Sequence, residues 1–90
     1  MVAAKEPFSG RGRLDIIATI LKASVEGVRK TTIMYKASLS FRQLQMYLPW
    51  LVTHGFLEVT NTEGIEIYKI TEKGNAFLET YRLLHAILKA

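Results

Sequence analysis

The sequence contains no cysteine, only two prolines and six glycines, and no long apolar run. The absence of cysteine excludes disulfide bonds, thiolate metal sites and a cysteine nucleophile. The longest apolar stretches, such as residues 46–52, are far shorter than the roughly 20 residues that a membrane-spanning helix needs. The first residues also lack the basic segment and apolar run of a secretory signal. These absences, with 49% hydrophobic residues in a 90-residue chain, predict a soluble, cytoplasmic, folded domain.

The sequence also lacks any residue pattern that supports catalysis. No paired carboxylates, nucleophile with an adjacent base, or glycine-rich phosphate loop is present. The two histidines, His54 and His85, have no second ligand at metal-binding spacing. We therefore expect a protein that is not an enzyme, that uses no cofactor or metal, and that has no evident small-molecule ligand.

Positive charge is concentrated in the first part of the chain. Residues 1–55 carry eight lysines and arginines against three acids, whereas residues 56–90 carry four against five. The net charge of +4 is thus the balance of +5 in the first part and −1 in the second. This asymmetry suits a surface that binds a polyanion, although an ordinary basic, solvated surface explains it equally well.

The first half of the sequence predicts an arm and two helices. Residues 1–10 show no apolar period and are expected to form a flexible arm, with the folded domain spanning residues 11–90. From residue 13 to before residue 27, apolar side chains recur at helical spacing, namely Leu14, Ile17, Ala18 and Leu21. Residues 29–31 have extended character, and Thr31 or Thr32 is placed to cap a short second helix over residues 33–37.

The second half predicts a third helix, a β-hairpin and a fourth helix. Ser40 is a suitable N-cap for the third helix, Gln43 completes a capping box, and Gly55 is placed to end the helix. Two strand-like runs then flank residues 61–64, a turn that contains glycine. Thr71 is a suitable N-cap for a leucine-rich last helix over about residues 72–90. The predicted α+β order is helix, short strand, helix, helix, hairpin and helix.

The third helix has one apolar face and one polar face. A helical wheel places its leucines on one side, with Tyr47 and Phe41 beside them: Leu44, Leu48 and Leu51. Arg42 and Met46 lie opposite, with Gln45 and Gln43 on the flanks. Arginine favours guanine, glutamine favours adenine, and an apolar side chain can contact the thymine methyl group in the major groove. The polar face therefore carries chemistry that can read DNA, although an isolated helix of this kind is more commonly an ordinary solvated one.

The order of elements is the order in which a winged helix-turn-helix is built. Over about residues 13–78 the sequence also resembles the archaeal winged helix-turn-helix family that includes the ten-kilodalton Sulfolobus chromatin-associated DNA-binding proteins. The residues that carry this resemblance are Thr32-Ile33-Met34-Tyr35, Ala37, Leu39-Ser40-Phe41, Gln43-Leu44, Tyr47-Leu48, Leu51, Gly55, Ile70-Thr71 and Lys73-Gly74. The resemblance implies a nucleoid-associated protein that binds double-stranded DNA through the third helix and forms homodimers through the last helix.

These considerations name a set of contact residues. The expected DNA contacts are Arg42, Gln43, Gln45, Met46 and Ser40 on the third helix, with Lys36, Arg29, Lys30, Arg11 and Arg13 as phosphate contacts and Asn61 and Thr62 on the wing. The last helix carries two apolar stripes at helical spacing, which we expect to form the dimer interface: Phe77, Tyr81, Leu84 and Leu88, with Leu83 and Ile87 beside them.

Two features depart from the family pattern. Pro49 lies inside the third helix, where it removes a backbone hydrogen bond and is expected to bend the helix. The wing carries Glu58, Glu63 and Glu66, which repel phosphate. Because a fold does not dictate a function, this acidic wing and Trp50 leave open a second function, a winged-helix module that binds protein without binding DNA. Packing of Trp50 at the edge of the core is the more expected role for that side chain.

Overall fold

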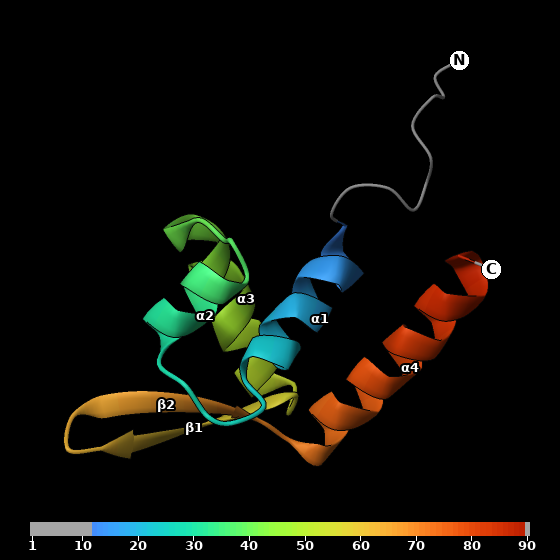
Figure 1. The fold of residues 1–90 in the computed structure, drawn as a ribbon. Coiled ribbons are helices and arrows are strands. Elements are labelled where there is room, and N and C mark those ends of the chain that lie inside the picture. Colours follow the sequence, from blue (N-terminus) through green and yellow to red (C-terminus); the bar gives the residue numbers. More distant parts are fainter. Residues whose placement is uncertain (1–11, 90) are drawn as a thin grey trace.

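The computed structural model describes residues 12–89, and Figure 1 shows the arrangement of their elements. The elements are α1 (Arg13–Ala23), α2 (Lys30–Lys36), α3 (Phe41–Thr53), β1 (Leu57–Thr62), β2 (Ile65–Ile70) and α4 (Glu72–Lys89). Four helices thus accompany one antiparallel hairpin, which confirms the predicted α+β order. The expected arm over residues 1–10 and the expected contact Arg11 lie outside the described residues.

Helix α1 supplies the centre of the core. The Gly12 amide donates to Asp15 Oδ2 at 3.0 Å, which fixes the first turn. Ile20 and Leu21 are fully buried, as the apolar period predicts. Leu14 was expected on the same stripe, but it is exposed, because it lies in the first turn of the helix, before the buried residues begin.

Helix α2 begins three residues earlier than the sequence predicts. Its N-cap is Arg29 rather than a threonine, and the extended residue before it is Val28. The Val28 amide donates to the Tyr68 carbonyl at 2.9 Å, and the Tyr68 amide donates back at 2.8 Å. This pairing with β2 ends the extended segment at Arg29. Tyr68 itself is buried; this burial, followed by the carboxylate of Glu66, raises the pKa of its phenol.

The hairpin has a tighter turn than the sequence predicts. The strands pair from Leu57 opposite Ile70 to Thr62 opposite Ile65, so the turn consists of two residues rather than residues 61–64. Glu63 and Gly64 have φ of 53° and 83°, and two positive φ values define the turn whose twist matches that of the strands.

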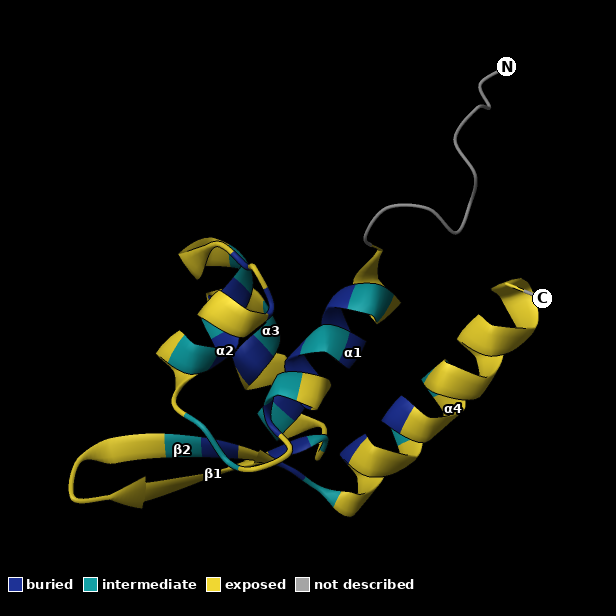
Figure 2. Ribbon diagram, in the orientation of Figure 1, coloured by how far each residue is buried: buried dark blue, intermediate teal, exposed yellow. Residues whose placement is uncertain are grey.

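The core lies between α1, α3, the base of the hairpin and the start of α4. The predicted cap of α4 is confirmed, because Thr71 Oγ1 accepts from the Gly74 amide at 3.0 Å. The same hydroxyl donates to the Gly55 carbonyl at 2.6 Å, which joins the end of α3 to the start of α4. Figure 2 shows buried residues gathered at these junctions, whereas the tip of the hairpin and the end of α4 are exposed. Within residues 12–89, no helix is both long and apolar enough to span a bilayer.

Candidate nucleic-acid interface

Helix α3 is fixed in the domain by its leucines. Leu44, Leu48 and Leu51 are buried, as the helical wheel predicts. Their burial leaves Arg42 and Gln45 exposed on the outer face of the helix. Met46 is exposed beside them, with 64% of its surface in solvent.

One residue at the edge of α3 differs from what the wheel implies. Phe41 was placed beside the leucines, but it is 54% exposed, because the first residue of the helix lies beyond the buried turn. Pro49 is exposed within the helix, which continues through it to Thr53. The bend expected at Pro49 remains a prediction.

A capping box occupies one of the two predicted glutamines. The Gln43 amide donates to Ser40 Oγ at 3.1 Å, and the Ser40 amide donates to Gln43 Oε1 at 3.0 Å. The Gln43 carbonyl oxygen therefore already has a partner, and a bidentate contact with adenine needs both ends of the side-chain amide. Gln45 is not part of this capping box, and its side chain is exposed. Gln43 thus caps α3, whereas Gln45 does not.

The helix-turn-helix segment is free of acidic residues. No aspartate or glutamate occurs between Glu26 and Glu58, an interval that contains both α2 and α3. The predicted phosphate contacts in this segment are all exposed, namely Arg29, Lys30 and Lys36. Because no carboxylate of the same segment neutralises these cations, the surface around α2 favours contact with phosphate. Arg13 is also exposed, but it belongs to α1.

The wing has the opposite character. Glu58, Glu63 and Glu66 are all exposed along the hairpin, which projects from the body of the molecule in Figure 1. Asn61 and Thr62 are exposed strand residues rather than turn residues. Asn61 Oδ1 accepts from the Gly64 amide at 3.0 Å, so this carbonyl oxygen supports the turn. The wing is therefore a much less favourable surface for contact with phosphate than α2 and α3 are.

One exposed aromatic residue of the helix-turn-helix segment, Tyr35, was not singled out by the sequence pattern. Tyr35, near the end of α2, is 85% exposed. Ile33 is the buried residue of that helix, and Tyr35 follows it by two positions, which places it on the other side of the helix. Trp50, which was expected at the edge of the core, is 45% exposed, and its ring stacks on His54 at 4.2 Å between centroids.

A row of stacked rings joins α3 to α4. Trp50 stacks on Phe56 at 5.9 Å, and Phe56 meets the edge of Phe77 at 5.8 Å. Along α4, Phe77 stacks on Tyr81 at 6.4 Å, and Tyr81 stacks on His85 at 5.6 Å. The row therefore runs from the last turns of α3 to His85, in the second half of α4.

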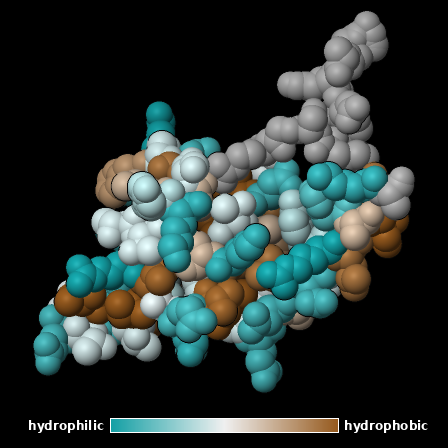
Figure 3. Space-filling model, in the orientation of Figure 1, coloured by the Kyte–Doolittle hydropathy of each residue, from teal (hydrophilic) through white to brown (hydrophobic). Residues whose placement is uncertain are grey.

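The two apolar stripes predicted on α4 have different environments along its length. Phe77 and Tyr81 pack against the core of their own domain. The Tyr81 hydroxyl donates to Asp15 Oδ1 of α1; this hydrogen bond, followed by burial, raises the pKa of Tyr81 to about 12. The apolar residues beyond Tyr81 are exposed, namely Leu83, Leu84, Ile87 and Leu88. Figure 3 shows apolar surface at this end of the helix.

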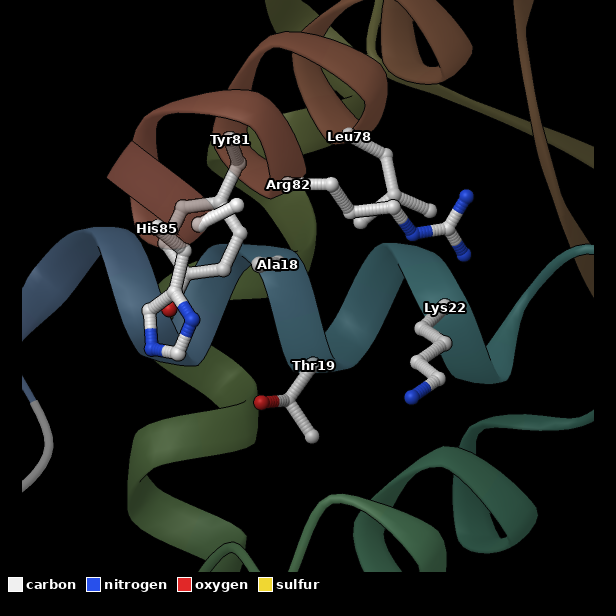
Figure 4. Close-up of a pocket in the computed structure, with 8 residues that line it drawn as sticks. Ala18, Thr19, Lys22, Leu78, Tyr81, Arg82 and His85 are labelled. Atoms are coloured by element: carbon white, nitrogen blue, oxygen red, sulfur yellow. The ribbon is translucent and has the colours of Figure 1, made fainter. Parts of the chain in front are cut away.

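A hollow of 330 Å³ lies where α4 crosses α1. Figure 4 shows its apolar lining, formed by Ala18 and Leu78 together with the ring of Tyr81. Lys22 and Arg82 line the same hollow. Arg82 also lies 4.0 Å from Glu79 on the same helix. The hollow is separate from the outer face of α3.

A family model described as winged helix-turn-helix matches residues 10–89. Two uncharacterised proteins of Methanocaldococcus jannaschii are 33% identical over 84 residues and 34% identical over 64 residues. These alignments cover 88% and 70% of this chain but 38% and 65% of the relatives, so the chain spans less than two thirds of either relative.

A solved structure agrees with these matches. The crystal structure of Sso10a-2, a DNA-binding protein from Sulfolobus solfataricus, has a TM-score of 0.81 with this chain at 29% identity. The superposition covers 88% of this chain and 83% of that chain. The resemblance found in the sequence and the predicted fold class are both confirmed, and the chain belongs to the winged helix-turn-helix family.

Proposed function

We propose that the protein binds double-stranded DNA, with α3 in the major groove. The observation that carries this proposal is the outer face of α3, which is exposed and lies within a segment free of acidic residues. An α-helix fits the width of the major groove, where base edges can be read. The DNA-binding protein Sso10a-2, similar in both fold and sequence, supports the same function.

The environments of the side chains suggest a division of roles. Arg42, Gln45 and Met46 contact base edges from the exposed face of α3. Ser40 and Gln43 keep their capping partners and contribute mainly by fixing the first turn of α3. The main phosphate contacts come from Arg29, Lys30 and Lys36. Additional contacts come from the start of the chain and from the wing, namely Arg11, Arg13, Asn61 and Thr62. Phosphate contacts position the protein, whereas base contacts select the sequence.

A homodimer joined through the end of α4 is part of this proposal. Leu83 and Ile87 are 60% and 70% exposed, and Leu84 and Leu88 lie on the same projecting segment. A second copy would cover these leucines and the isoleucine, whereas Phe77 and Tyr81 stay with their own domain. Sedimentation of the wild type beside Leu84→Lys tests this step, because a charge in an apolar interface should shift a dimer to monomers. An unchanged sedimentation coefficient would contradict the assigned interface.

The proposed role is that of a nucleoid-associated protein of the cytoplasm, acting as a transcription regulator or as a chromatin protein. A selection from random duplexes separates the two roles. A dimeric regulator should enrich paired half-sites about 34 Å, or a multiple of that distance, apart. A chromatin protein should enrich no such pair.

Salt dependence of binding tests the proposal as a whole. Each phosphate contact contributes about −0.9 to the slope of log affinity against log salt, so the three cations of the α2 region predict a slope of about −3 per chain. Arg42→Ala should weaken binding more than Lys89→Ala, which removes a cation at the far end of α4. Absence of binding at low salt, or binding that salt does not change, would reject the proposal.

A further inference from the structure

The turn between α2 and α3 displays two exposed aromatic rings. Tyr35 is the most exposed large apolar side chain within residues 12–89, and Phe41 is more than half exposed. Neither ring takes part in the ring stacking found in that part of the chain. Burial of such a side chain contributes favourably to the free energy of folding or binding. The fold leaves that contribution unused at both positions, so both rings are available to a ligand.

The two rings lie at the same end of the helix pair. The Leu39 amide donates to the Met34 carbonyl at 3.0 Å, and the Ser38 amide donates to the Tyr35 carbonyl at 3.3 Å. These bonds bring the start of α3 back to the end of α2. With standard backbone dimensions, the first of them limits the distance between the Cα atoms of Tyr35 and Phe41 to about 15 Å.

Each ring is followed directly by a cation. Lys36 follows Tyr35, and Arg42 follows Phe41. Both cations are exposed, and no acidic residue lies between Glu26 and Glu58. The turn therefore repeats one pattern, an exposed ring beside an exposed positive charge, in a segment without opposing charge.

A nucleotide of single-stranded DNA matches this pattern. Its base offers an aromatic face on which a protein ring can stack, and its phosphate pairs with a neighbouring cation. In an intact duplex the faces of the bases are covered by their neighbours, so stacking of this kind is specific to unpaired bases. We propose that the α2–α3 turn binds single-stranded DNA, with Tyr35 and Phe41 stacking on bases and Lys36 and Arg42 contacting phosphates. This inference shares Lys36 and Arg42 with the proposed function, in which Arg42 contacts base edges, and it adds a second ligand.

The test compares three labelled DNA probes of about 16 nucleotides by fluorescence anisotropy at one salt concentration. The probes are oligothymidylate, an abasic strand with the same phosphates, and a duplex. Since stacking adds to phosphate attraction, oligothymidylate should bind at least about tenfold more tightly than the abasic strand. Equal affinity for these two strands would overturn the inference.

Substitutions then assign the contacts. Tyr35→Leu and Phe41→Leu keep an apolar side chain and remove the aromatic face, so each should weaken oligothymidylate binding about fivefold or more. Tyr35→Phe keeps the ring and should retain the wild-type affinity within about twofold. Ile65→Ala, at an exposed apolar residue of the hairpin, is the matched control and should change nothing. Circular dichroism verifies that each variant is folded.

The outcomes separate this inference from the proposed function. Binding of the duplex without preference for oligothymidylate over the abasic strand would overturn the inference and keep the proposed function. Failure to bind any of the three probes would reject both. Tight binding of oligothymidylate that Tyr35→Leu and Phe41→Leu leave unchanged would show that single strands bind elsewhere on the protein.

Discussion

Separate replacement of Gln43 and Gln45 by alanine distinguishes the stability of α3 from its ability to read bases. Gln43→Ala removes the oxygen that accepts from the Ser40 amide at 3.0 Å. Loss of one such hydrogen bond costs about 0.5–1.5 kcal/mol, partly offset by the higher helix propensity of alanine. For a domain of this size, the melting temperature should therefore fall by about 2–8 °C. Gln45→Ala removes no hydrogen bond of the cap and should leave the unfolding free energy within about 0.5 kcal/mol of the wild type.

The same two variants should have the reverse ranking in DNA binding. A good bidentate contact with adenine contributes about 1–3 kcal/mol of discrimination, so Gln45→Ala should weaken binding to a preferred duplex by about 5- to 150-fold. Gln43→Ala should stay within about threefold, because its amide belongs to the cap. Urea unfolding and fluorescence anisotropy at fixed salt measure the two quantities. A folded Gln43→Ala protein that binds DNA more weakly than Gln45→Ala would refute this division of roles.

Two further predictions concern α4. In Gly74→Ala, the new Cβ would lie 2.4 Å from the Phe56 carbonyl oxygen, so the unfolding free energy should fall by about 1–3 kcal/mol despite the gain in helix propensity. Asn75→Ala, at the exposed neighbouring position, should not lower it, and equal stability of the two variants in urea would contradict the packing argument. The pKa of Tyr81 rises from 10.0 to about 12 through its hydrogen bond to Asp15 and through burial, so its stabilising effect should be complete below pH 10 and lost as the pH rises through 12. The difference in unfolding free energy between wild type and Tyr81→Phe should shrink over that range in urea titrations, and a constant difference would exclude the linkage.

The sequence predicts α3 well because several local signals coincide there. The cap at Ser40, the leucine period and the stop at Gly55 all act within one short segment, and each depends on neighbouring residues. The same holds for the start of α4, where Thr71 satisfies the Gly74 amide. Elements that are determined by their own residues can be predicted from a single sequence.

Other features depend on contacts between distant residues. The start of α2 is determined by the pairing of Val28 with Tyr68, which no local pattern records. A helical period gives the direction of a side chain but not whether another element covers it, so Leu14 and Phe41 were misplaced at helix ends. The period also does not show which atoms of Gln43 already have a hydrogen-bond partner. For these reasons the sequence indicated which face of α3 is exposed but not that the capping box holds the Gln43 side chain.

The stacked rings between α3 and α4 have a mechanical consequence. The contacts of Phe56 with Trp50 and Phe77 connect the last turns of α3 to the half of α4 that packs on the domain. The two helices should therefore move as one rigid unit. The exposed apolar residues at the end of α4 then point in a fixed direction relative to the outer face of α3. Inserting a single residue just after Tyr81 would turn that end by about 100° and advance it by about 1.5 Å. In the proposed dimer, the angle between the two subunits would therefore depend on the number of residues between Phe77, which the rings join to α3, and the exposed leucines.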